Sequence, residues 1–117
     1  YPVAVLSDDA RDLIGAKTRG VYLSYYDLIK QQVSRAGQGF DSEQYARVQA
    51  VIEAPKLVVS KGDYLSLFAS DSTGEWYVAV LQTTQTGQGV FLKSFRRSNS
   101  RDVALHKKRS TPLVDQM

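Results

Sequence analysis

Residues 56–95 have the sequence KLVVSKGDYLSLFASDSTGEWYVAVLQTTQTGQGVFLKSF, and this stretch decides the fold. It contains four runs rich in β-branched and aromatic residues, at residues 57–59, 64–69, 76–84 and 89–95. The connectors between the runs each contain glycine, which accepts the positive φ that tight turns require. We therefore predict a four-stranded antiparallel meander.

The first half of the chain carries helix signals. Ser7, followed by two aspartates, suits the N-terminal cap of a short helix that ends near Gly15. Asp41 suits the cap of another helix, which Pro55 would end. Helices grouped before a sheet indicate an α+β fold, with the N-terminal helices packed on one face of the meander and the other face open for binding. The remaining elements are expected as a helix from Ser24 or Asp27 to Val33, brief strands at residues 3–6 and 21–23, and a short C-terminal helix capped by Ser98, Asn99 or Ser100.

The length of 117 residues is that of one domain, and we expect a single domain over residues 1–117. The chain contains no cysteine, which excludes disulfides and cysteine-based zinc sites. No apolar run approaches the roughly 18 residues that span a bilayer, so we expect no spanning helix and no membrane partner. Because the sequence opens on Tyr-Pro and not on Met, we expect the C-terminal fragment of a longer protein.

Charge is distributed unevenly along the chain. Residues 1–92 hold eight Lys or Arg against ten Asp or Glu, whereas residues 93–109 hold seven against one. A solvated charge run is the simplest explanation of a basic tail. Here the basic run begins inside an apolar strand, which favours a positioned patch and a polyanionic partner such as RNA.

The strand end within this patch carries cations next to hydroxyl groups. Ser94 and Arg96 should share one face, because side chains alternate along a strand. Lys93, Phe95 and Arg97 should share the other face. Paired arginines beside serines suit a phosphate, although a solvated strand end is the alternative, and we expect Ser94, Arg96 and Arg97 in a catalytic site. The expected RNA-binding residues are Lys93, Ser98, Arg101, Lys107, Lys108 and Arg109.

His106 is the only histidine, and we expect it to be the fourth catalytic residue. RNA cleavage without a metal needs a base for the 2′-hydroxyl, an acid for the departing 5′-oxygen and cations on the phosphate. Asp102 lies four residues before His106, so the two side chains can meet on one helical face. The alternative for His106 is a solvated position near a helix C-terminus, where its charge suits the dipole. Asp8, Asp9 and Asp12 could form a carboxylate cluster for a metal, but the dipole at a helix N-terminus explains them more simply. We therefore expect no metal, and we also expect no cofactor.

Three segments carry a resemblance to known proteins: residues 75–80 (EWYVAV), residues 91–97 (FLKSFRR), and the passage from a helix into a strand at residues 45–59. They are similar to the phage-borne members of the barnase, EndoU, colicin E5/D and RelE nuclease superfamily. These members are found at the C-termini of phage Mu-type head morphogenesis (MuF) proteins. The resemblance covers most of the chain, from about Leu6 to Arg109.

The resemblance implies an α+β fold whose sheet carries an RNA-cleaving site, used by a toxin on RNA such as transfer RNA. The polar strand end of that family falls on Ser94, Arg96 and Arg97, and its basic terminal helix falls on residues 101–109. The parent would be a phage head or delivery polypeptide, located in the virion or secreted, and the toxin would act in the cytoplasm of a target bacterium. An acidic immunity protein that covers the basic face would be its partner. The alternative is a non-catalytic nucleic-acid-binding or protein-interaction module of a phage particle.

Overall fold

The computed structural model describes residues 2–22, 42–84 and 86–116. The helix expected from Ser24 or Asp27 to Val33, and the cap expected at Asp41, lie outside these residues. The elements in chain order are β1 (Pro2–Val5), α1 (Asp8–Ile14), β2 (Gly20–Tyr22), α3 (Ser42–Glu53), β3 (Leu57–Lys61), β4 (Tyr64–Ser70), β5 (Trp76–Thr83), β6 (Val90–Ser98), α4 (Ser100–Arg109) and β7 (Val114–Asp115).

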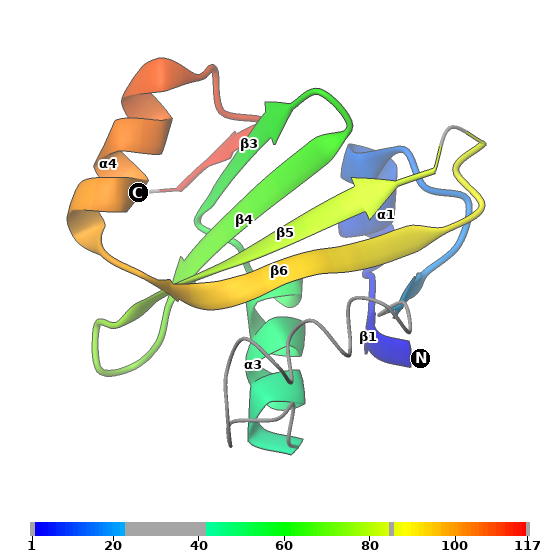
Figure 1. Cartoon of the computed structure of the whole chain (residues 1–117), viewed down its shortest axis with the longest axis horizontal. Helices are drawn as coiled ribbons and strands as arrows, with labels where there is room; N and C mark the ends of the chain where they lie inside the picture. Colours follow the sequence, from blue (N-terminus) through cyan, green and yellow to red (C-terminus); the bar gives the residue numbers. More distant parts are fainter. Residues whose placement is uncertain (1, 23–41, 85, 117) are drawn as a thin grey trace.

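One curled, mixed sheet dominates the molecule (Figure 1). Within the described residues it has seven strands in the order β1-β2-β6-β5-β4-β3-β7. The pair β2 and β6 is parallel, with Val21 opposite Val90, and all other neighbours are antiparallel. The expected fold class, a four-stranded meander covered on one face by N-terminal helices, was therefore wrong.

The reason for this error is that the additional strands carry little local signal. β2 has three residues and β7 has two, so neither shows a hydrophobic alternation that distinguishes a strand from a loop. The parallel pairing of β2 with β6 joins segments about seventy residues apart, and turn chemistry cannot predict it. Among the described residues the helices are few, and α4 packs on the face opposite α3, which was expected to be open.

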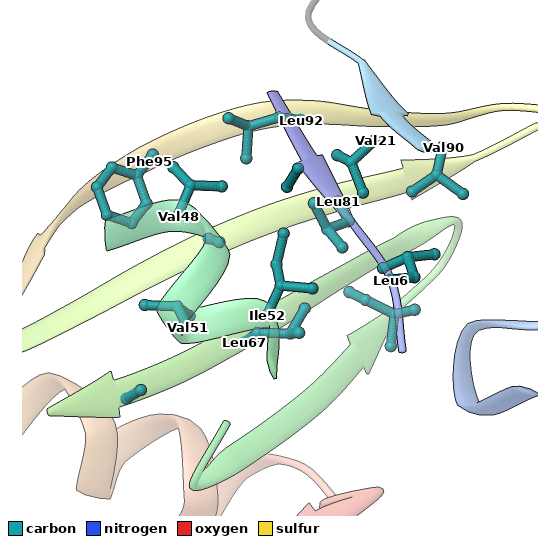
Figure 2. Packing of buried hydrophobic residues seen from close by; sticks show 14 of the residues in the cluster. Leu6, Val21, Val48, Val51, Ile52, Leu67, Leu81, Val90, Leu92 and Phe95 are labelled. Carbon is teal, nitrogen blue, oxygen red and sulfur yellow. The ribbon is translucent and has the colours of Figure 1, made fainter. Parts of the chain in front are cut away.

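The larger hydrophobic core lies on the face of the sheet that α3 covers, which we call the α3 face. Val48, Val51 and Ile52 of α3 pack there against Leu81 and Leu92 of the central strands (Figure 2). A smaller core lies on the opposite face, which we call the α4 face because Val103 of α4 packs into it. The strand residues of this smaller core are Leu57, Val59, Phe68 and Val78.

The backbone N–H and C=O of Val5, at the end of β1, are both bound by a side chain of α3. Gln49 of α3 accepts a hydrogen bond from Val5 N–H at 2.8 Å and donates one to Val5 C=O at 3.0 Å. The carboxamide therefore satisfies the donor and the acceptor that an edge strand otherwise presents to solvent. This pair of bonds also ties α3 to the N-terminal strand.

The first helix begins and ends where the sequence predicts. Ser7 is the N-cap of α1, and its side chain accepts a hydrogen bond from Ala10 N–H at 3.2 Å. Gly15 ends the helix at φ 78°, a backbone conformation that glycine adopts without steric cost.

No helix in the described part of the chain is both long enough and apolar enough to cross a membrane.

The turn between β4 and β5 is organised by one carboxylate. Asp71 Oδ1 accepts hydrogen bonds from the Thr73 hydroxyl at 2.6 Å, Thr73 N–H at 2.9 Å and Glu75 N–H at 3.0 Å. The hydrogen bond from the Thr73 hydroxyl, supported by the backbone donors, holds the pKa of Asp71 below its ordinary value of 3.8.

This pKa direction makes the stability of the protein depend on pH below 3.8. A carboxylate whose pKa is lowered in the folded state stabilises the fold at pH values above its pKa in the unfolded state. This stabilisation is lost as the pH falls through the pKa of the folded state. Asp71→Asn should therefore be less stable than wild type at neutral pH, and the difference should vanish in acid. Urea unfolding at a series of pH values measures this. Thr73→Val removes the hydroxyl hydrogen bond that is the main cause of the lowered pKa. Asp71→Asn should therefore cost less stability at neutral pH when it is made in the Thr73→Val protein. A difference in stability between wild type and Asp71→Asn that does not change with pH would contradict the assignment.

Candidate functional site

Asp102 is the centre of a polar cluster where β6 runs into α4. Its Oδ2 accepts a hydrogen bond from the Ser98 hydroxyl at 2.6 Å and lies 3.7 Å from a guanidinium nitrogen of Arg96. On the other side, Oδ1 lies 3.4 Å from His106 Nδ1. We call Arg96, Ser98, Asp102 and His106 the Asp102 cluster. It unites three of the expected site residues around a carboxylate that the sequence suggested only as a partner for His106.

The cluster is positioned by a short connection and a helix cap. Asn99 alone separates β6 from α4, and its side chain accepts a hydrogen bond from Asp102 N–H at 2.8 Å. Val103 is fully buried in the smaller core, which fixes the rotation of α4 against the sheet. His106 follows Asp102 by one helical turn, and its ring lies 5.1 Å from the ring of Phe68. The Asp102 carboxylate therefore contacts His106 of α4 as well as Arg96 and Ser98 of β6.

A bulge in β6 decides which side chains face the cluster. Leu92 pairs with Leu81 and Ser94 pairs with Val80, so Lys93 is an extra residue in the ladder. Arg96 pairs with Val78, which lies in the core of the α4 face. Ser94 and Arg96 therefore share the α4 face, as predicted, whereas the register leaves Lys93 outside the regular alternation.

Arg97 lies on the other face of the sheet from Arg96. It pairs with Tyr77, which is buried in the larger core, and its Nε lies 3.8 Å from Glu75 Oε2. Tyr77 donates a hydrogen bond from its hydroxyl to the same Glu75 oxygen at 3.1 Å. Burial, together with this carboxylate, raises the pKa of Tyr77 above its ordinary value of 10.0. The two neighbouring arginines therefore cannot hold one phosphate together.

The expected RNA-binding residues of α4 differ in their surroundings. Arg101, Lys108 and Arg109 are exposed to solvent, as surface cations that meet a polyanion should be. Lys107 is partly buried, and its Nζ lies 3.2 Å from Asp115 Oδ2 in β7. The C-terminal strand therefore holds one of the cations of the basic segment.

The chemistry of the Asp102 cluster follows from the hydrogen-bonding groups around the imidazole. His106 Nδ1 lies 2.9 Å from the backbone carbonyl oxygen of Asp102 as well as near its carboxylate. Both neighbours are acceptors, so Nδ1 carries the hydrogen and the lone pair of neutral His106 is at Nε2. The carboxylate, and not the imidazole, lies between Ser98 and His106, so Ser98 is not placed as a nucleophile activated by histidine.

Metal ligation has no obvious place among these side chains. Across residues 2–22, 42–84 and 86–116, no group of three or more His, Asp or Glu side chains is arranged to hold a metal ion. A cleft of about 620 Å³ lies between α1 and the hairpin turns of the sheet, where Lys17, Ser60 and Thr84 line it. None of the expected site residues lines that cleft.

No protein-family model matches the chain, and no solved structure matches it either. The resemblance to the nuclease superfamily rests on the sequence segments alone and stays a prediction.

Asp102 should contribute more to stability than an acid in a surface ion pair. Asp102→Ala removes the acceptor of the Ser98 hydroxyl and the carboxylate that faces Arg96 and His106. A hydrogen bond to a charged group contributes about 1.5–3 kcal/mol. Because Asp102 is partly exposed, we expect a loss near the lower end, about 1–2 kcal/mol in urea unfolding.

Asp115→Ala is the matched control for this measurement. Its ion pair with Lys107 lies at the surface, where such pairs contribute about 0–1 kcal/mol. Equal losses for the two variants would show that the Asp102 contacts add nothing beyond an ordinary surface pair.

Proposed function

We propose that the junction of β6 and α4 binds RNA and cleaves its backbone by metal-independent phosphodiester transfer. The observation that carries the proposal is the Asp102 cluster, which gathers a guanidinium, a hydroxyl and an imidazole in the one net-positive segment of the chain. An imidazole with a fixed tautomer and a guanidinium beside it are the groups that such a reaction needs. Exposed Arg101, Lys108 and Arg109 supply attraction to the phosphate backbone.

In the proposed reaction, Nε2 of His106 removes the proton from a ribose 2′-hydroxyl. The 2′-oxygen then forms a bond to phosphorus, the bond from phosphorus to the 5′-oxygen breaks, and the departing 5′-oxygen takes a proton from solvent. The products are a 2′,3′-cyclic phosphate and a 5′-hydroxyl end. Arg96 stabilises the negative charge that grows on the phosphate oxygens, and Ser94, on the same face, donates to the phosphate. Asp102 orients His106 and stabilises the imidazolium that forms.

The proposed biological setting follows the sequence resemblance. The chain would be the toxin domain of a phage head or delivery polypeptide, and it would act on RNA such as transfer RNA in the cytoplasm of a target bacterium. The exposed cations of α4 favour an acidic immunity protein as its neutralising partner, because opposite charges steer two proteins together.

A second candidate is a non-catalytic module that binds nucleic acid or a protein in a phage particle. The observation that favours it is the position of Asp102, whose negative charge already faces Arg96 and His106. The remaining exposed cations of α4 suffice for salt-sensitive binding without turnover.

Cleavage of labelled transfer RNA in EDTA tests the proposed reaction. Arg96→Ala and His106→Ala should each lower the rate by at least about 100-fold, the usual contribution of a general acid–base or charge-stabilising group. Arg97→Ala is the matched control, because Arg97 lies on the opposite face with Glu75, and it should stay within a few-fold of wild type.

Two outcomes would decide against the reaction. Equal losses for Arg96→Ala and Arg97→Ala would contradict the assignment of the site to the α4 face. RNA that stays intact with wild-type protein, but binds it with an affinity that falls as salt rises, would establish the second candidate.

A further inference from the structure

Three aromatic residues and a glutamine form a row across four strands of the sheet. Tyr64 of β4 pairs with Gln82 of β5, Gln82 pairs with Phe91 of β6, and Phe91 pairs with Tyr22 of β2. Paired residues of neighbouring strands share a face of the sheet. We call these four residues the aromatic row. Each is next in the chain to a residue of the larger core, so the row lies on the α4 face; these core residues are Leu65, Leu81, Leu92 and Val21.

The rings of the aromatic row are accessible. Tyr64 is 42% exposed and Tyr22 is 39% exposed, while Phe91 is half-buried. The smaller core, into which α4 packs, includes none of these three side chains among the described residues. Large aromatic side chains that are exposed together on one face mark a surface that binds a partner.

Glycines give two of the rings room to lie along the sheet. A Cβ atom at Gly20 would lie 2.8 Å from the ring of Tyr22, and a Cβ atom at Gly89 would lie 3.1 Å from the ring of Phe91. Each ring therefore fills the space above the glycine two residues before it. A ring that already rests on the backbone loses little freedom when a flat ligand stacks on it.

A hollow beside the row adds polar groups to the aromatic rings. It has a volume of about 400 Å³, and its lining residues are Asp63, Gln82, Thr83, Thr84 and Phe91. A carboxamide offers donors and an acceptor, and a carboxylate accepts a hydrogen bond from an amino group such as that of cytosine. The hollow therefore provides partners for the polar edge of a base, next to a ring on which the face of the base can stack.

We propose that the aromatic row binds single-stranded nucleic acid through stacking of its bases. This inference rests on the proposed function, for which it defines the substrate as an unpaired segment of RNA. Tyr64 and Phe91 lie two strands apart, which is about 10 Å. Successive bases of a duplex are about 3.4 Å apart along each strand. Bases that stack on both rings must therefore be splayed, which a single strand permits and a duplex does not.

One bound strand can contact the row and the Asp102 cluster together. Gln82 of the row lies four residues along β5 from Val78, the partner of Arg96, a distance of about 13 Å. At the β3 end of the row, Lys61 pairs with Tyr64 and adds an exposed cation on the same face. Bases on the row thus leave the phosphate backbone within reach of Arg96.

The test is fluorescence anisotropy of the full chain with a labelled single-stranded oligodeoxynucleotide. The probe has mixed sequence and about ten nucleotides, within the usual site size of single-strand-binding domains. It has no 2′-hydroxyl, so the proposed reaction cannot cleave it. At about 0.15 M salt, we expect saturable binding that is at least about tenfold tighter than that of the duplex of the same sequence.

Variants identify the rings that bind the probe. Tyr64→Leu and Phe91→Leu each remove a ring but keep an apolar side chain, and each should weaken binding about tenfold. Tyr64→Phe keeps the ring and should bind like wild type. Leu113→Ala is the matched control, because it removes an exposed apolar side chain outside the row, and it should also bind like wild type. Urea unfolding of each variant separates a loss of binding from a loss of stability.

The outcomes that overturn the proposal are distinct. Equal affinity for the single strand and the duplex would show that charge alone attracts nucleic acid. Equal weakening by Leu113→Ala would remove the assignment to the row. Displacement of the probe by micromolar cellohexaose, a neutral glucose chain, would replace the nucleic acid by a carbohydrate.

Failure of this proposal and failure of RNA cleavage can be told apart. Cleavage of RNA by a protein that does not bind the oligodeoxynucleotide would contradict only the aromatic row. Binding of the oligodeoxynucleotide that depends on Tyr64 and Phe91, together with intact RNA, would contradict only the proposed reaction.

Discussion

The ladder between β5 and β6 pairs eight positions and shifts register once, between Val80 and Leu81. That shift inserts Lys93 as an extra residue and reverses the alternation of the side chains that follow it. Leu92 and Phe95 can therefore both be buried in the larger core. Leu92 and Phe95 are three residues apart, so with regular alternation one of them would face the opposite side of the sheet. The same reversal places Arg96 over the smaller core, where α4 docks, so the packing of the sheet and the composition of the site depend on one bulge.

The Asp102 cluster shows how a helix can be tied to a strand by electrostatics as well as by packing. Val103 anchors α4 through burial, while Asp102 reaches back to Ser98 and Arg96 on the strand and forward to His106 on the next turn. A phosphate that approached Arg96 would compete with this carboxylate. The guanidinium lies 3.7 Å from Asp102 Oδ2, beyond a close hydrogen bond, so its N–H groups can turn towards a second acceptor.

The sequence predicted what local pattern encodes. The four β-rich runs form the successive strands β3 to β6, and Ser7 and Gly15 bound the first helix, because turn and capping chemistry act over a few residues. The pairing of β2 with β6 and the two-residue β7 depend on contacts that form only when distant segments meet. The separation of Arg96 from Arg97 was predictable from strand alternation, whereas the bulge at Lys93 was not.

The carboxamide of Gln49 imitates a neighbouring strand. Its oxygen and nitrogen engage the N–H and C=O of Val5 with the donor and acceptor pattern of a peptide group. Among the described strands, Val5 lies on an outer one, and 58% of its surface is exposed. Free backbone groups at such an edge allow another molecule to add a strand. A helix side chain thus occupies at Val5 the place that a second copy would need for edge-to-edge growth. At Val5, a residue outside the sheet therefore limits the capacity of this edge to pair with another strand.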